Sequence, residues 1–294
     1  QINNAATATG TLTMLVNDLD LVGTINAGAN AVNVTTATPT LGIDLGNRIG
    51  GTLNLDSGEL SRITTSGLLT LGDTAHTGAI SINSTISNPA GASGGVTIVN
   101  NTGGIFVNGA VTYSTGTGNL TLSANGNGAT TGAITTNTSS ALDVSGTLTM
   151  NAATGVGTPD SPMVLSHAAG TTLKVTNTTS GGVFVREDLG DLNIDSINNN
   201  LAATSAGIDL NAGTNLSINV GTNLNINGRI ENKFGNIQFV TGNDAAYTGA
   251  GGFRLSPALV PVGTLGGVNI NGPVIANNGG AISIFSTGAV TQSI

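Results

Sequence analysis

The sequence predicts an all-β fold, a parallel β-solenoid whose coils have three sides. Short runs of alternating apolar and polar residues recur along all 294 residues, and most begin just after a glycine. Charged residues make up only 7% of the chain, whereas an ordinary globular domain carries roughly 25%. The 45 glycines suit a chain that turns often. These three observations favour one continuous repeat array over compact domains.

The segment from Gly42 to Ile86 shows the pattern most clearly. Its three alternating apolar runs are Leu53–Leu55, Leu69–Leu71 and Ile80–Ile82. Period-two alternation is typical of half-buried strands, and the preceding glycines fit corners. We therefore expect a strand, a corner and a further strand, repeated.

One short helix is expected inside this segment, over Ser57–Ile63. Leu60 and Ile63 are three residues apart, so they share a helix face. Glu59 and Arg62 have the same spacing and can pair beside them.

The other alternating runs extend the pattern along the chain. In order, they are Gly10–Met14, Leu19–Val22, Thr24–Asn26, Val32–Val34, Gly94–Val99, Gly103–Val107, Gly118–Leu122, Gly132–Ile134, Gly146–Met150, Lys174–Arg186, Gly213–Asn219, Gly221–Asn227 and short runs after Gly235. Val96–Asn108 resembles Lys174–Arg186, which indicates an internal repeat. Repeat units of roughly 20–26 residues would give about a dozen coils.

The scarcity of charge has a physical reason in a stacked fold. Equivalent residues of neighbouring coils lie about 4.8 Å apart, where like charges repel. Uncharged Asn, Thr and Ser can instead hydrogen-bond along the stack, and asparagine ladders stabilise it. The net charge of −8 and only seven basic residues argue against a nucleic-acid partner.

Two stretches are predicted to be irregular. The stretch Gly242–Gly263, rich in glycine and proline, is expected to protrude as a loop, and Thr158–Ser166 is expected to form a second loop. No cysteine is present, so no disulfide is expected. Neither end carries an amphipathic cap, so we expect both ends to meet further coils, of a longer chain or of another copy.

An acidic group is the main candidate for a binding site. It contains Glu187, Asp188, Asp191 and Asp195, and carboxylate oxygens are ligands that Ca²⁺ prefers. The alternative is a solvated edge in which Arg186 pairs with one of the acids, and this alternative is favoured. The glycine- and aspartate-rich calcium repeat of some β-helices is absent.

No catalytic, metal-binding or cofactor-binding residue is predicted. His76 and His167 lie far apart in the sequence, without a carboxylate pattern around them. A carbohydrate-active β-helix enzyme remains an alternative, and it would need two carboxylates within about 10 Å of each other. Lys174 and Lys233 are the only lysines to support such a site.

A lattice-binding protein, for example one that binds ice, is a further alternative. Thr-x-Thr steps suggest it, at Thr7–Thr9, Thr11–Thr13, Thr136–Thr138 and Thr147–Thr149. Their spacing is irregular, which favours ordinary threonines on strand faces. Asn-x-Ser/Thr triplets, which are sugar acceptors in secreted proteins, begin at Asn33, Asn83, Asn119, Asn137, Asn177 and Asn215.

Gly42–Ile86 resembles a repeat of large bacterial filamentous-haemagglutinin-like surface proteins. The matching residues are Asp44–Gly46, Gly51–Leu55, Glu59–Thr64, Leu69–Gly72 and Gly78–Ile82. A weaker match is Gly155–Ser166, where Ser-Pro-Met replaces Asn-Pro-Leu.

This resemblance implies a right-handed parallel β-helix, export across the outer membrane, and a structural role in an adhesin or extracellular filament at the bacterial cell surface. Such a segment would be non-catalytic, and cell-surface glycans or host cells would be its binding partners besides further coils. Nothing in the sequence resembles the secretion domain of the family.

Overall fold

The computed structural model describes residues 2–3, 10–47, 51–87, 91–113, 118–136, 141–199, 216–220, 222–233, 235–241, 266–277 and 280–293. The predicted loop Gly242–Gly263 lies outside these residues. The chain divides into two compact units, 1–151 and 152–294. β-Strands dominate both units, and the paired strands run parallel, which confirms the predicted parallel all-β fold.

The first unit contains one described α-helix, α1 (Ser57–Ser61), and the 3₁₀ helix η1 (Gly126–Gly128). Its strands are β1 (Ile2–Asn3), β2 (Leu12–Leu15), β3 (Ile25–Asn26), β4 (Val32–Thr35), β5 (Ile43–Leu45), β6 (Leu53–Leu55), β7 (Ile63–Thr65), β8 (Leu69–Gly72), β9 (Ile80–Ile82), β10 (Ile86–Ser87), β11 (Gly91–Ala92), β12 (Val96–Val99), β13 (Ile105–Val107), β14 (Val111–Tyr113), β15 (Leu120–Ser123), β16 (Ile134–Thr135), β17 (Ala141–Val144) and β18 (Thr147–Ala152).

The second unit consists of strands alone among its described residues. They are β19 (Met163–Leu165), β20 (Thr171–Asn177), β21 (Val183–Glu187), β22 (Leu192–Asn199), β23 (Leu216–Val220), β24 (Leu224–Ile226), β25 (Ile230–Asn232), β26 (Ile237–Thr241), β27 (Val268–Ile270), β28 (Val274–Ala276), β29 (Ile282–Ser286) and β30 (Val290–Gln292).

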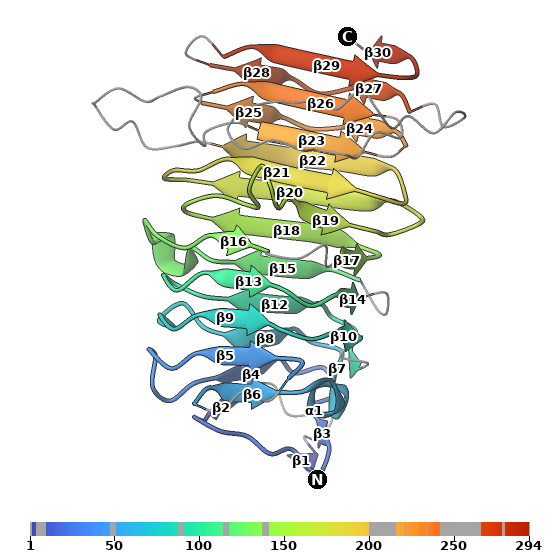
Figure 1. Cartoon of the computed structure of the whole chain (residues 1–294). Helices are drawn as coiled ribbons and strands as arrows, with labels where there is room; N and C mark the ends of the chain where they lie inside the picture. Colours follow the sequence, from blue (N-terminus) through green and yellow to red (C-terminus); the bar gives the residue numbers. More distant parts are fainter. Residues whose placement is uncertain are drawn as a thin grey trace. The chain divides into compact units, whose positions relative to one another are not determined.

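Sheets in the first unit join strands from successive turns of the chain. The longest runs in the order β2-β4-β8-β12-β15-β18 (Figure 1). Three others run β1-β3-β7-β11, β10-β14-β17 and β6-β5-β9-β13-β16. In the last of these, β6 pairs with β5 on the side away from β9, so the order in space departs from the order in sequence.

The second unit repeats this arrangement with two main sheets, β19-β21-β23-β26-β29 and β20-β22-β24-β27-β30. Strand β25 pairs with β22 and β28, so the long strand β22 has separate partners for its two halves. Each turn of the chain therefore supplies strands to both sheets, as a solenoid requires.

Rows of apolar side chains form the core of each unit. One row in the first unit follows the register of the longest sheet through Val32, Leu69, Val96, Leu120 and Leu148. Each of these side chains is at most 5% exposed. Burying a side chain of this kind contributes roughly 1.5–3 kcal/mol, so the stacked rows are the main source of stability.

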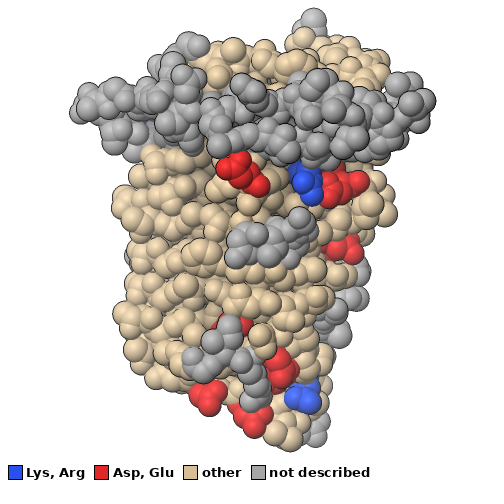
Figure 2. Space-filling view, viewed as in Figure 1, with Lys and Arg blue, Asp and Glu red and all other residues tan. Residues whose placement is uncertain are grey.

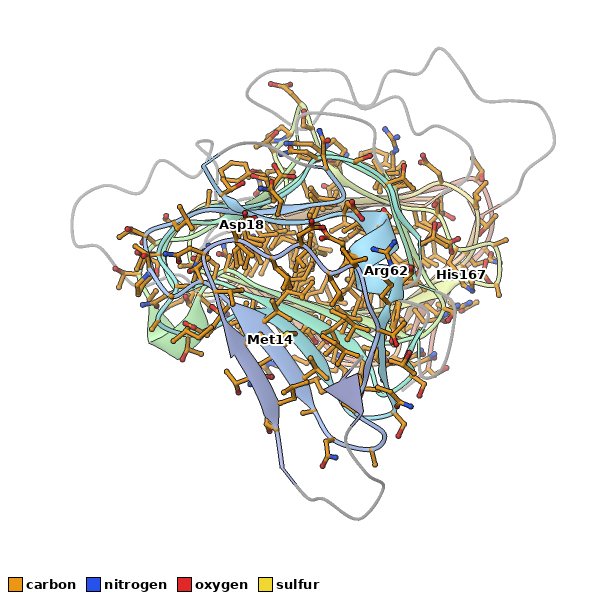
Figure 3. The ribbon with its side chains drawn as sticks, turned by 90° about the horizontal axis from the view of Figure 1, so that it is seen from below. Met14, Asp18, Arg62 and His167 are labelled. Carbon is orange, nitrogen blue, oxygen red and sulfur yellow. The ribbon has the colours of Figure 1, made fainter. Side chains whose placement is uncertain are left out.

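Helix α1 ties two turns of the first unit together. Asp56 and Glu59 form a capping box, since the Asp56 side chain accepts from the Glu59 N–H and the Glu59 side chain accepts from the Asp56 N–H. The other Glu59 oxygen, Oε1, accepts from the N–H of Leu21 at 2.9 Å. Arg62, which lies beside α1 in Figure 3, donates from Nη1 to the carbonyl oxygen of Leu21 at 2.6 Å.

The expected helix is confirmed over Ser57–Ser61, but Ile63, which was predicted to share its face with Leu60, begins strand β7. The predicted charged pair also has another role. Glu59 and Arg62 both bind the backbone of Leu21, which belongs to the preceding turn. The predicted strand Leu19–Val22 is wrong for the same reason. Glu59 and Arg62 satisfy the N–H and the carbonyl oxygen of Leu21, and the segment forms no strand.

The predicted loop Thr158–Ser166 also needs correction. A tight turn joins Thr158 and Ser161 through two backbone hydrogen bonds, as the prolines suggested. The residues that follow form the buried strand β19, in which Met163, Val164 and Leu165 are at most 3% exposed. A three-residue apolar run beside proline gives too weak a periodic signal to distinguish a strand from a loop.

Candidate functional site

The acidic group predicted at Glu187–Asp195 lies at the corner between β21 and β22. Glu187 ends β21, Asp188 opens the turn, Asp191 precedes β22, and Asp195 lies within that strand. Asp195 sits where the register between β20 and β22 shifts, so it is the extra residue of a β-bulge. Glu187, Asp188 and Asp191 therefore lie at the corner, whereas Asp195 lies further along β22.

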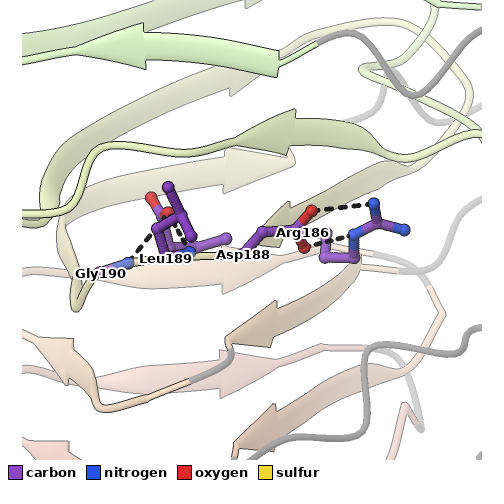
Figure 4. Close-up of polar contacts among 5 residues, drawn as sticks. Arg186, Asp188, Leu189 and Gly190 are labelled. Carbon is purple, nitrogen blue, oxygen red and sulfur yellow. Dashed lines mark hydrogen bonds and ion pairs between the residues drawn. The ribbon is translucent and has the colours of Figure 1, made fainter.

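Three of the four carboxylates have separate partners. Asp188 receives two hydrogen bonds from Arg186, at 2.7 and 3.0 Å (Figure 4). Asp191 accepts from the Thr222 hydroxyl and from the backbone and side chain of Asn223. Asp195 pairs with the Lys174 ammonium at 2.7 Å. The sequence suggested that Arg186 pairs with one of the acids, and Asp188 is that acid.

These separate partners leave no shared coordination sphere. Across the described ranges, no three His, Cys, Asp or Glu side chains gather in an arrangement that fits a metal ion. Charged side chains are also sparse on the face shown in Figure 2.

Glu187 differs from its neighbours because it points into the coil. Its side chain is fully buried. Oε1 accepts from the N–H groups of Leu189 and Gly190, at 3.2 and 3.3 Å (Figure 4). Burial raises the pKa of the Glu187 carboxyl, and the nearby charge of Asp188 raises it further, while the hydrogen bonds from the two amides and the nearby Thr171 hydroxyl act in the opposite direction.

The two histidines belong to different units. His76 is buried in the first unit, with Nδ1 3.1 Å from the Thr36 hydroxyl. Burial lowers the pKa of His76, and the neighbouring Asp73 partly opposes this effect. Asp73 in turn accepts a hydrogen bond from Thr35 at 2.8 Å. His167 lies in the second unit, in the connection before β20.

Outward-facing asparagines form hydrogen-bonded rows in the second unit, as the composition predicted. The Asn225 side chain donates to Asn193 at 3.0 Å, Asn269 donates to Asn225 at 2.7 Å, and Thr291 donates to Asn269 at 2.6 Å. These partners are 32, 44 and 22 residues apart in the sequence. The two longer steps exceed the expected coil of 20–26 residues, and they span 200–215 and 242–265, which lie outside the described residues.

A second asparagine row lies inside the same unit. Asn177 donates to Asn199, and Asn199 donates to Asn232, both at 2.7 Å. All three side chains are fully buried. Asn177 therefore does not offer its amide as a sugar acceptor in the folded chain, and the triplets at Asn137 and Asn215 lie outside the described residues.

Threonines form a row on the outer face of the first unit. The register of β8, β12, β15 and β18 places Thr70, Thr97, Thr121 and Thr149 side by side. All four are partly exposed. The sequence did not reveal this row, because the chain between successive strands varies in length and only the pairing aligns them. Of these residues, only Thr149 was part of a predicted Thr-x-Thr step.

Hollows in the two units are lined almost entirely by apolar side chains. One in the first unit is lined by Leu60, Leu71, Ile86, Val96, Ile98, Val111, Tyr113 and Leu120. One in the second is lined by Phe239, Ile270, Gly272, Pro273, Val274, Ile282, Ile284 and Gln292. Neither lining contains a carboxylate.

The chain was compared with protein-family models, with curated proteins and with solved structures, and none matched. None of the helices in the described part of the chain has the length and apolar character needed to cross a bilayer.

Proposed function

We propose that the chain is a non-catalytic, structural segment of a secreted bacterial surface adhesin or extracellular filament. The proposal includes a right-handed parallel β-helix of about a dozen coils. One observation carries it: polar side chains on the strands pair with their equivalents on the next turn, as Asn193, Asn225 and Asn269 do. Groups arranged in this way stabilise a stack, and they do not converge on a substrate.

The extracellular location is supported by two properties of the sequence. The motif at Gly42–Ile86 resembles a repeat of filamentous-haemagglutinin-like surface proteins, and its apolar runs Leu53–Leu55, Leu69–Leu71 and Ile80–Ile82 lie in strands. The chain also lacks cysteine, so its export would need no disulfide chemistry.

The proposed partner is a further solenoid coil, from an adjoining repeat or from another copy of the chain. An interior row of the second unit runs through Val183, Leu216, Ile237 and Ile282. The first three side chains are fully buried, whereas Ile282 is 44% exposed. A coil that pairs with β29 would cover Ile282 and continue the row.

Two measurements on the native material test the proposal. Electron microscopy should show thin extended fibres, and antibodies against the 294-residue chain should label intact, unpermeabilised cells. Labelling only after cell lysis would contradict the surface location. Compact particles without fibres would contradict the structural role, and cleavage of polysaccharides by the purified chain would contradict its non-catalytic nature.

A second candidate function, binding to an ordered lattice such as ice, is favoured by the row Thr70, Thr97, Thr121 and Thr149. Its hydroxyls repeat at the strand spacing of about 4.8 Å. The paired variant Thr97→Lys and Thr121→Lys should abolish binding to ice crystals if this function is present. Thr112→Lys is the control, because Thr112 is also partly exposed but lies on β14 in another sheet. Equal ice binding by both variants, or none by the parent chain, would exclude this function.

A further inference from the structure

The turn between β21 and β22 is held by a side chain that no solvent reaches. Glu187 Oε1 accepts from the N–H groups of Leu189 and Gly190, so one carboxyl oxygen fixes two successive amides of the turn (Figure 4). Leu189 itself is 60% exposed. The turn therefore lies at the surface, and the Glu187 side chain that holds it lies inside the coil.

The second oxygen of the Glu187 carboxyl, Oε2, has no hydrogen-bond partner. Glu187 Oε2 and the Thr171 hydroxyl are both buried, and neither completes a hydrogen bond. The two groups nevertheless lie close enough for Thr171 to affect the titration of Glu187. The Thr171 hydroxyl can donate to an ionised Oε2, or accept from Oε2 when that oxygen carries a proton. Only the neutral acid satisfies both atoms without placing a charge inside the coil.

Among the described residues, no cation lies free to pair with an ionised Glu187 carboxylate. Asp188, the next residue in the chain, repels the ionised carboxylate, and the Arg186 guanidinium is bound to Asp188. The paired residues on β19 and β23 are apolar, namely Leu165 and Val220. From β20 the facing group is the neutral Thr171. A buried charge without a counter-ion is strongly unfavourable.

We propose that the turn Asp188–Gly190 is a pH-sensitive latch, closed while Glu187 carries a proton and loosened when Glu187 releases that proton to solvent. The exposed Leu189 and the Arg186–Asp188 ion pair change position with the latch. The proposal does not depend on the chain being an adhesin, because it follows from the corner alone.

The direction of the pH dependence follows from the raised pKa of Glu187. In the unfolded chain the carboxyl has its ordinary pKa of 4.5. The stabilising contribution of neutral Glu187 is therefore complete below that pH, and it is lost as the pH rises through the folded pKa. Alkaline conditions open the latch.

Hydrogen exchange on the full 294-residue chain and on its Glu187→Gln variant tests this inference. The glutamine keeps an acceptor for the two amides and has no charge to lose. We expect protection of the Leu189 and Gly190 amides, corrected for intrinsic exchange, to fall between pH 4.5 and pH 8 in the parent chain only. At pH 8 both amides should be more strongly protected in the variant than in the parent chain.

A matched control and a direct titration complete the test. Glu231→Gln alters a partly exposed glutamate that pairs with Arg229, and it should leave the protection profile unchanged. The carbon-13 shift of the Glu187 carboxyl in the parent chain should titrate above pH 4.5. Titration at or below that pH, or lower protection in Glu187→Gln than in the parent at pH 8, would overturn the latch.

Discussion

Asn177 donates from Nδ2 to Oδ1 of Asn199 over 2.7 Å, at a place where neither side chain is exposed to solvent. An asparagine side chain carries a donor and an acceptor, so it can receive from one turn and donate to the next. Asn199 does both, because it also donates to Asn232. Identical side chains in register can thus replace the water that their amides lose on burial.

Replacing Asn199 by Ala should lower the free energy of unfolding of the second unit by about 2–3 kcal/mol. The substitution leaves the acceptor of Asn232 unsatisfied and removes a partner of Asn177, and each unsatisfied buried group costs about 1–3 kcal/mol. Urea unfolding measures the effect. Asn225→Ala, in the partly exposed row, is the control and should cost less than about 1 kcal/mol, since water replaces the lost bonds. An equal loss of unfolding free energy in the two variants would show that burial does not strengthen the contribution of the asparagine row.

Replacing Arg62 by Ala should destabilise the first unit by about 1.5–3 kcal/mol, the range for hydrogen bonds to charged groups. The carbonyl oxygen of Leu21 loses its donor, and the turn that contains Leu21 loses one of its two attachments to α1. Hydrogen exchange at Leu21 and thermal unfolding report the change.

Arg229→Ala provides the comparison for this prediction. Arg229 pairs with Glu231 at the surface, and exposed ion pairs contribute about 0–1 kcal/mol. A loss in Arg62→Ala no larger than in Arg229→Ala would contradict the role assigned to Arg62.

Three glycine-to-alanine variants of the first unit should form a graded series. Gly72 has φ +83°, and a Cβ there would lie 2.2 Å from the carbonyl oxygen of Val99. Gly51 has φ +85° without any atom within 4 Å of its Cβ position, and Gly10 has neither restriction. We expect Gly51→Ala to cost about 1–2 kcal/mol through the left-handed backbone, Gly72→Ala to cost more, and Gly10→Ala to be neutral or slightly stabilising.

Chemical unfolding of the three variants separates backbone strain from close stacking. The difference between the free energies of unfolding of Gly72→Ala and Gly51→Ala measures the cost of the close contact between neighbouring turns. If these two variants lose the same stability, the approach of the Val99 carbonyl has no energetic effect.

The stability of the first unit should fall as the pH is lowered from about 7 to 5. The pKa of His76 lies below its ordinary value of 6.5 because the imidazole is buried. The contribution of neutral His76 is therefore present above pH 6.5 and is lost as the pH falls through the folded pKa. Buried Nε2 also has no hydrogen-bond partner, which adds to the cost of charging the ring.

The variant His76→Gln should lose less stability than the parent chain as the pH is lowered. Urea unfolding repeated across the pH range measures this loss. His167→Gln changes a histidine of the second unit and should leave the profile of the first unit as it was. If His76→Gln loses as much stability at low pH as the parent chain, the pH dependence belongs to other groups.

Much of the fold was predictable from single residues and their spacing. Alternation placed Leu53, Leu69 and Ile80 in strands, and Leu216 and Leu224 in the core, and all five are buried. These predictions succeeded because period-two burial is a local property of an extended chain.

The candidate site was less predictable. Glu187 and Asp188 are neighbours in an acidic stretch, yet one is buried inside the coil and the other pairs with Arg186 at the surface. Composition does not distinguish them, because the direction of a side chain depends on the strand's register. Arg62 shows the same limit, since its partner Leu21 is 41 residues away.

The sequence alone determined that the chain forms short parallel strands with apolar interiors and uncharged, hydrogen-bonding exteriors. Tertiary structure decided which turns lie next to one another, and hence that Asn177 meets Asn199 and that Thr97 lies between Thr70 and Thr121. The reason is physical. Alternation is encoded within a few residues, whereas the register between turns depends on connections of unequal length, which only the completed stack aligns.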